Sequence, residues 1–93
     1  MKTLCIQIGN SDNKLTQGEW SDFCLDTHKA CLKFGKQVHL VGYSASNSQY
    51  QNACVIVDVW PHKKSNLISE LIDIKDAYRQ DSIAVLSGET EFI

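Results

Sequence analysis

Residues 3–35 read TLCIQIGNSDNKLTQGEWSDFCLDTHKACLKFG, and this stretch decides the fold because it predicts a strand followed by a helix. In its first six residues, Leu4, Ile6 and Ile8 alternate with other side chains, as expected of a strand that buries one face. A dense group of turn-forming residues follows at 9–13. We therefore expect the chain to turn directly after the strand and then to enter the helix.

Two overlapping signals mark the start of that helix. Thr16 and Glu19 have the spacing of a capping box, and Leu15 and Trp20 have that of a hydrophobic staple. A core-facing stripe then recurs every three or four positions: Trp20, Phe23, Cys24, Thr27, Cys31 and Phe34. Gly35 stands where a capping glycine with left-handed backbone belongs, so the helix is predicted over 17–34.

The rest of the chain predicts three more strands and a second helix. The strands are expected at 38–43, 53–60 and 82–86, and Pro61 ends the second of these. Ser65 is the predicted N-cap of the second helix, whose stripe is Leu67, Leu71, Ile74 and Tyr78. The order βαββαβ favours one α+β domain over residues 1–93, of the ferredoxin-like type. Its antiparallel sheet has strand order 4-1-3-2, with both helices on one face.

This topology brings three connections, 9–15, 44–52 and 79–82, to the same end of the sheet. Their polar residues form the candidate ligand site: Asn10, Ser11, Asp12, Gln49, Tyr50, Gln51, Asn52, Arg79, Gln80 and Asp81. Amide groups can recognise a polar ligand, and an arginine offers a planar fork to phosphate or carboxylate. The alternative is that these residues only build turns, which use the same residue types.

Other constellations in the chain are weaker candidates for chemistry. Cys24, His28 and Cys31 share one helix face, but a core position explains the two cysteines equally well, so no metal site or cofactor is predicted. A small enzyme would need His39, Asp81 or Cys54 as acid, base or nucleophile. No catalytic motif supports that alternative, and no catalytic residue is predicted.

The sheet face opposite the helices is predicted to be apolar. Its expected members are Cys5, His39, Val41, Tyr43, Cys54, Ile56 and Trp60. A contiguous apolar patch usually marks an interaction surface, so we expect a homodimer that pairs this face through Tyr43, Ile56 and Trp60. The C-terminal tail, Phe92 and Ile93, offers a second route to a dimer. It can instead fold back over its own sheet.

Composition argues against several other classes of function. The net charge of −2 does not suggest a nucleic-acid-binding protein. Residues 53–58 contain no Phe, Tyr, Lys or Arg, so the base-stacking strand of RNA-recognition domains is missing. No stretch is apolar enough to span a membrane, and the N-terminal apolar run is too short for a signal peptide. We therefore expect a cytoplasmic protein with four reduced cysteines.

Four stretches carry a resemblance to known proteins: residues 8–17, 51–54, 78–84 and 88–92. Through them the chain resembles small uncharacterised proteins of bacteria and their phages. The resemblance implies a microbial or viral setting and transfers no function. Our leading hypothesis is a non-enzymatic binding protein that holds a small polar or phosphorylated ligand as a homodimer. The alternative is a phage-type inhibitor of a host defence complex. It would act through its apolar face or acidic tail (Glu89, Glu91), or sequester a nucleotide signal.

Overall fold

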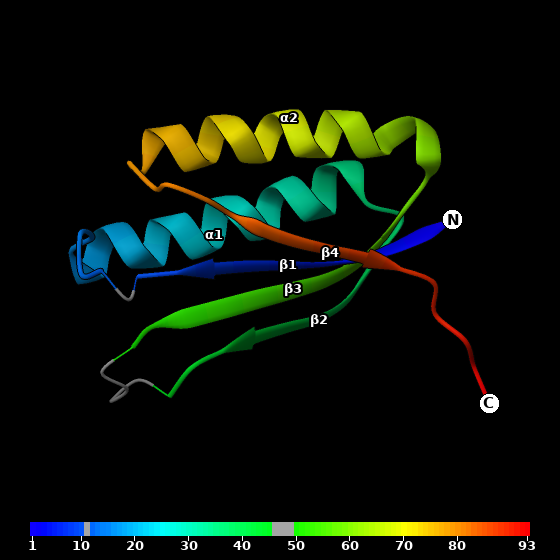
Figure 1. Cartoon of the computed structure of the whole chain (residues 1–93), viewed down its shortest axis with the longest axis horizontal. Helices are drawn as coiled ribbons and strands as arrows, with labels where there is room; N and C mark the ends of the chain where they lie inside the picture. Colours follow the sequence, from blue (N-terminus) through cyan, green and yellow to red (C-terminus); the bar gives the residue numbers. More distant parts are fainter. Residues whose placement is uncertain (11, 46–49) are drawn as a thin grey trace.

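A computed structural model of the chain describes residues 1–10, 12–45 and 50–93. The elements are β1 (Lys2–Gly9), α1 (Gln17–Phe34), β2 (Gln37–Tyr43), β3 (Asn52–Val59), α2 (Pro61–Ala77) and β4 (Ala84–Gly88). All pairings in the sheet are antiparallel and its order is β2-β3-β1-β4, the predicted order counted from the other edge. Both helices lie on one side of the sheet (Figure 1). The predicted ferredoxin-like α+β fold is therefore confirmed.

The core lies between the helices and the two central strands. Alternate residues of β1 and β3 are buried, as the period of a half-buried strand requires. The larger cluster contains Leu4, Ile6, Ala30, Cys31, Val55, Val57, Val59, Leu67 and Leu71. A second cluster, beside the start of α1, contains Ile8, Leu15, Trp20, Phe23, Cys24 and Ala53. The apolar stripes of both helices thus face the sheet, as predicted.

Both ends of α1 are as predicted, but the backbone conformation of the glycine that follows it is not. The Glu19 backbone N–H donates to Thr16 Oγ1, and the Thr16 N–H donates to Glu19 Oε1, both at 3.1 Å, which completes the capping box. Gly35 has φ −81°, so the predicted left-handed conformation is wrong. A β carbon at this position would collide with the Val57 side chain and the Cys31 carbonyl. Glycine is needed here for close approach to β3.

The second helix begins five residues earlier than predicted. Trp60 is its N-cap and Pro61 its first residue, whereas the predicted cap, Ser65, lies inside the helix. Proline suits the first helical turn because its φ is already helical and its missing N–H would have no partner in the helix. The same proline therefore ends β3 and starts α2.

A β-bulge in β2 changes which of its residues face the helices. Val38 pairs with Val57 and Leu40 pairs with Ile56, so one extra residue lies between these two positions of β2. An extra residue reverses the alternation of side chains along the rest of the strand. Leu40 therefore shares the outer face with Ile56.

Because of the bulge, two residues predicted on the outer face lie on the other side of the sheet. Val41 packs against the buried core, and Tyr43 pairs with Ala53, a core residue. The predicted placement of Tyr43 on the outer face is therefore wrong. Trp60 follows β3 and is 43% exposed, and its ring lies 5.0 Å from Lys36 Nζ.

One aromatic pair ties the end of α2 to α1. The Tyr78 ring stacks on Phe23 with centroids 5.0 Å apart, and the Tyr78 hydroxyl donates to Asp26 Oδ2 at 2.6 Å. Burial, and then the hydrogen bond to Asp26, raise the pKa of Tyr78 to about 12. The hydroxyl therefore stays protonated at neutral pH, and it holds the segment that leads into the α2–β4 connection.

Candidate functional site

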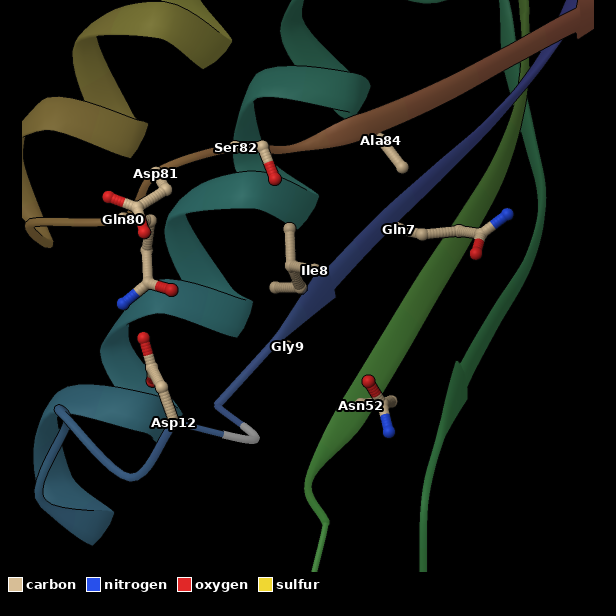
Figure 2. Close-up of a pocket in the computed structure, with 9 residues that line it drawn as sticks. All are labelled: Gln7, Ile8, Gly9, Asp12, Asn52, Gln80, Asp81, Ser82 and Ala84. Carbon is tan, nitrogen blue, oxygen red and sulfur yellow. The ribbon is translucent and has the colours of Figure 1, made fainter.

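The three polar connections lie at the same end of the sheet, as the topology predicted (Figure 1). A depression of about 330 Å³ opens there between the β1–α1 and α2–β4 connections. Figure 2 shows the residues that line it: Gln7, Ile8, Gly9, Asp12, Asn52, Gln80, Asp81, Ser82 and Ala84. We call this the loop-end depression. Segments far apart in the sequence therefore meet in one hollow.

The side chains of three loop residues gather at one side of the loop-end depression. Asp12 points toward Gln80 and Asp81 across the gap between the two connections (Figure 2). Lys14 Nζ bridges the two carboxylates, at 3.6 Å from Asp12 and 3.7 Å from Asp81. The Asp81 side chain is 96% exposed, and ion pairs at such wet sites contribute little to stability. Both carboxylates can therefore exchange this contact for a ligand.

Gly9, another lining residue of the depression, lies in close contact with the start of β3. A β carbon on Gly9 would come within 2.9 Å of Asn52 Oδ1 and 3.5 Å of the Gln51 carbonyl oxygen. Gly9 and Asn52 are direct partners across the β1–β3 pair. The absence of a side chain therefore lets the end of β1 lie against Asn52.

Of the ten predicted site residues, four line the loop-end depression: Asp12, Asn52, Gln80 and Asp81. The other lining residues were missed: Gln7, Ile8, Gly9, Ser82 and Ala84. Most of them belong to strands, where nothing in the local pattern points to a site. The signal available for Gln7 was a polar side chain between the apolar Ile6 and Ile8.

The side chain of Asn10 forms hydrogen bonds within the β1–α1 connection and to Gln51. It is only 3% exposed, and its Nδ2 donates to the Leu15 carbonyl at 3.1 Å and to Gln51 Oε1 at 3.0 Å. The Leu15 N–H donates in turn to Asn10 Oδ1 at 3.0 Å. Both donors and one acceptor of the amide are thus used within the protein. Asn10 shapes the β1–α1 connection and does not line the loop-end depression.

The remaining predicted residues of the β1–α1 and β2–β3 connections also lie away from the depression. The side chains of Gln51 and Gln17 exchange two hydrogen bonds, at 2.7 and 3.1 Å, which fasten the start of α1 to β3. Tyr50 is 57% exposed and does not line the depression. Ser11 and Gln49 lie outside the residues that the structure describes.

Arg79, the predicted partner of an anionic group, binds a carboxylate of this same chain. Its guanidinium lies 2.7 Å from Glu19 Oε2. This contact with Arg79, followed by the hydrogen bond from Thr16, holds the pKa of Glu19 below its usual range. Arg79 thus reinforces the start of α1. None of the residues that line the depression is a lysine or an arginine.

A chain of polar contacts crosses the outer face of the sheet at its other end. His39 Nε2 lies 2.8 Å from Asp58 Oδ2, and the Thr3 hydroxyl donates to Asp58 Oδ1 at 2.7 Å. Thr3 also shares a hydrogen bond of 2.6 Å with the Thr90 hydroxyl. Thr3 therefore contacts the carboxylate that holds His39. In a serine-protease-like relay the hydroxyl would instead be bonded to the imidazole. The Thr3 hydroxyl is bonded to the carboxylate, so these three residues do not have that arrangement.

We expect Asp58 to make folding stability depend on pH in acid. The hydrogen bond from Thr3, and then that from His39, hold the pKa of Asp58 below its ordinary value of 3.8. A depressed pKa stabilises the fold above the ordinary value, and this contribution is lost as the pH falls through the lower folded-state pKa. Asp58→Asn should lower the free energy of unfolding by about 1–2 kcal/mol at neutral pH.

Urea unfolding at a series of pH values from neutral to below 3.8 measures this effect. The wild type should lose stability through the acid range more steeply than Asp58→Asn. Asp73→Asn, at an exposed position of α2, is the matched control and should follow the wild type. An identical acid dependence in wild type and Asp58→Asn would contradict the prediction.

The buried cysteines have the properties of structural thiols. Burial raises the pKa of Cys24 to about 11 and that of Cys31 to about 12. The two residues also belong to different core clusters. Within the described part of the chain, no group of three or more His, Cys, Asp or Glu side chains is placed to hold a metal ion.

Comparison with known proteins links this chain to others by structure alone. No protein-family model matches it, and no curated protein matches its sequence. A DUF3240 family protein from Shewanella baltica is similar with TM-score 0.54 and 14% identity over 99% of this chain and 92% of its own. The de novo designed protein Foldit4 has TM-score 0.57 and 11% identity over 97% and 96%. Arabidopsis thaliana At3g17210 has TM-score 0.57 and 10% identity over 99% and 96%.

These similarities establish the α+β fold and nothing about function. A designed chain has a similar fold, and a fold by itself does not imply a function. The three structures include a bacterial and a plant protein but no phage protein. Among the described helices, none is both long and apolar enough to cross a membrane.

Proposed function

We propose that this chain is a non-enzymatic binding protein that holds a small polar ligand in the loop-end depression. The observation that supports this function is the convergence of polar side chains from separate segments on one hollow. Its volume of about 330 Å³ lies at the lower end of the range for small-molecule sites. The four free cysteines fit the cytoplasm, where thiols stay reduced.

The ligand is expected to donate hydrogen bonds and to carry a positive or no charge. Asp12 and Asp81 supply carboxylate oxygens, which only accept hydrogen bonds when ionised. The amides of Asn52 and Gln80 can both donate and accept. Arg79 is engaged by Glu19, and Lys14 Nζ already pairs with both Asp12 and Asp81, so a phosphorylated ligand would meet two carboxylates against one cation. An amine or amidine therefore suits the site better than a phosphate ester.

Titration with agmatine and with inorganic phosphate, followed by amide chemical shifts in NMR spectra, tests this proposal. Agmatine should shift the amides of residues 12 and 80–82, and phosphate should leave them unchanged. Asp12→Asn and Asp81→Asn should each weaken agmatine binding about tenfold, since a charge-assisted hydrogen bond contributes about 1.5–3 kcal/mol. The control Asp73→Asn should bind like the wild type. Shifts confined to other surfaces, or produced equally by phosphate, would contradict the assignment.

The second candidate function is inhibition of another protein through the outer sheet face or the acidic tail. Exposed apolar side chains on that face favour it, among them Leu40 and Leu86. In the tail, Glu89 lies 3.4 Å from Lys2 Nζ, and Phe92 is 88% exposed. This function requires a heterologous complex that forms without any small ligand, and pull-down from host lysate with wild type and Leu86→Asp would detect it.

A further inference from the structure

The outer face of the sheet carries one continuous apolar row. Leu40 of β2 pairs with Ile56 of β3, Ile56 with Cys5 of β1, and Cys5 with Leu86 of β4. Leu40 is 53% exposed and Leu86 is 66% exposed. A row that crosses all four strands is a contiguous apolar patch, and such patches on small proteins usually mark an interaction surface.

A hollow lies beside this row because the next cross-strand row is made of small or slender side chains. Its members are Gly42, Cys54, Gln7 and Ala84. The hollow has a volume of about 480 Å³ and includes Cys5 and Cys54 among its lining residues. The face therefore offers both protruding side chains and a space that protruding side chains can enter. We call the apolar row and the hollow together the open face.

The carboxylate on the open face already has hydrogen-bond partners. Among the residues of the four strands that point to this side, the carboxylate is that of Asp58, whose Oδ2 lies 2.8 Å from His39 Nε2. Asp58 also accepts the hydrogen bond from Thr3. A partner with the same surface therefore brings no carboxylate without a hydrogen-bond partner into the interface, where such a group would be costly to bury.

We propose that a second copy of this chain covers the open face in a symmetric, face-to-face dimer. A two-fold axis parallel to the strands reverses the order of the apolar row in the partner. Leu40 then meets Leu86 of the partner subunit, and the bulky Ile56 meets the small Cys5 of the partner subunit. The face thus complements itself, as a two-fold interface requires.

The size of the open face suits a weakly bound dimer. Strands about 4.8 Å apart and residues about 3.3 Å apart make the patch roughly 20 Å by 20 Å, including side chains. Such a patch covers about 400 Å², about half of the roughly 800 Å² per partner that standard-size interfaces bury, which places the dimer among the small, weakly bound interfaces. We therefore expect a dissociation constant in the micromolar range, since interfaces of this size without strong anchor residues bind weakly.

Sedimentation velocity of the full chain over a range of concentrations tests the dimer. The wild type should shift from monomer to dimer as concentration rises, and Leu86→Asp should stay monomeric over the same range. Leu32→Asp is the matched control, because Leu32 is 60% exposed but lies on α1, away from the open face. Leu40→Asp, at the other end of the row, should reproduce the effect of Leu86→Asp.

Thiol labelling gives a second, independent readout. Cys5 and Cys54 line the open face, and their labelling should slow severalfold as the wild-type concentration rises. In Leu86→Asp their labelling should be fast at every concentration, while the buried Cys24 and Cys31 stay slow throughout. A wild type that stays monomeric, or equal dimerisation of Leu86→Asp and Leu32→Asp, would overturn the proposal. A monomer that instead forms a stoichiometric complex with a host protein would also overturn it.

Discussion

Replacement of Phe23 by alanine is expected to lower the free energy of unfolding by about 3–5 kcal/mol, as truncation of buried aromatic side chains does. Phe23 has no exposed surface and lies between Trp20, whose ring centroid is 6.1 Å away, and Tyr78, at 5.0 Å. Its loss leaves a cavity between the start of α1 and the end of α2. A chain of this length has a free energy of unfolding of about 5–14 kcal/mol, so Phe23→Ala is expected to remove a large part of it.

Urea unfolding followed by circular dichroism measures the effect of Phe23→Ala. Phe92→Ala is the control, because the Phe92 side chain is 88% exposed, and it should change stability by less than about 0.5 kcal/mol. Tyr78 leads into residues that line the loop-end depression, so Phe23→Ala should also shift the amide signals of residues 80–82. A loss of stability no larger than that of Phe92→Ala would contradict the assignment of Phe23 to the core.

Gly35→Ala is expected to cost about 2–3 kcal/mol, the upper part of the range for overpacking a well-packed core. The backbone of Gly35, with φ −81°, is open to any residue, so the cost is steric. The added β carbon would overlap the Val57 side chain and the Cys31 carbonyl, and the carbonyl belongs to backbone that cannot turn aside. Gly88→Ala is the control, since no other atom lies within 4 Å of the β carbon built there.

A double-mutant cycle separates this steric explanation from a loss of backbone freedom. Val57→Ala removes one of the two groups that the added β carbon would overlap. Gly35→Ala should therefore lower the free energy of unfolding by about 1 kcal/mol less in the Val57→Ala background than in the wild type. An equal cost in both backgrounds would mean that the Val57 contact is not the cause. Both values come from denaturant midpoints, provided that the slope of the unfolding transition stays the same.

Much of the fold could be predicted from the sequence because its signals are local. The alternation of Leu4, Ile6 and Ile8 and the capping box of Thr16 and Glu19 each lie within one element. The order of these elements, with right-handed crossovers, then leaves few possible topologies. The same reasoning placed three connections at one end of the sheet, and hence Asp12 and Asp81 at the loop-end depression.

The errors arose where contacts distant in sequence override a local signal. The bulge between Val38 and Leu40 reverses the faces of β2, and Tyr43 turns to the helix side as a result. Gly35 looked like a left-handed cap, but its neighbour across the fold, Val57, explains the glycine. Arg79 looked available to a ligand, yet Glu19 lies 2.7 Å from it, 60 residues away along the chain.

By itself, then, the sequence determined the elements, their order and the end of the sheet where polar residues gather, since periodicity and capping act over a few neighbouring residues. The tertiary structure alone decided which of those polar side chains remain available. The side-chain amide of Asn10 bonds to Leu15 and Gln51, whereas Asp12 and Asp81 hold solvent-exposed ion pairs with Lys14 at the rim of the depression. Hydrogen bonds and strand register form between residues that the chain brings together only on folding. No local pattern encodes which partner each side chain meets.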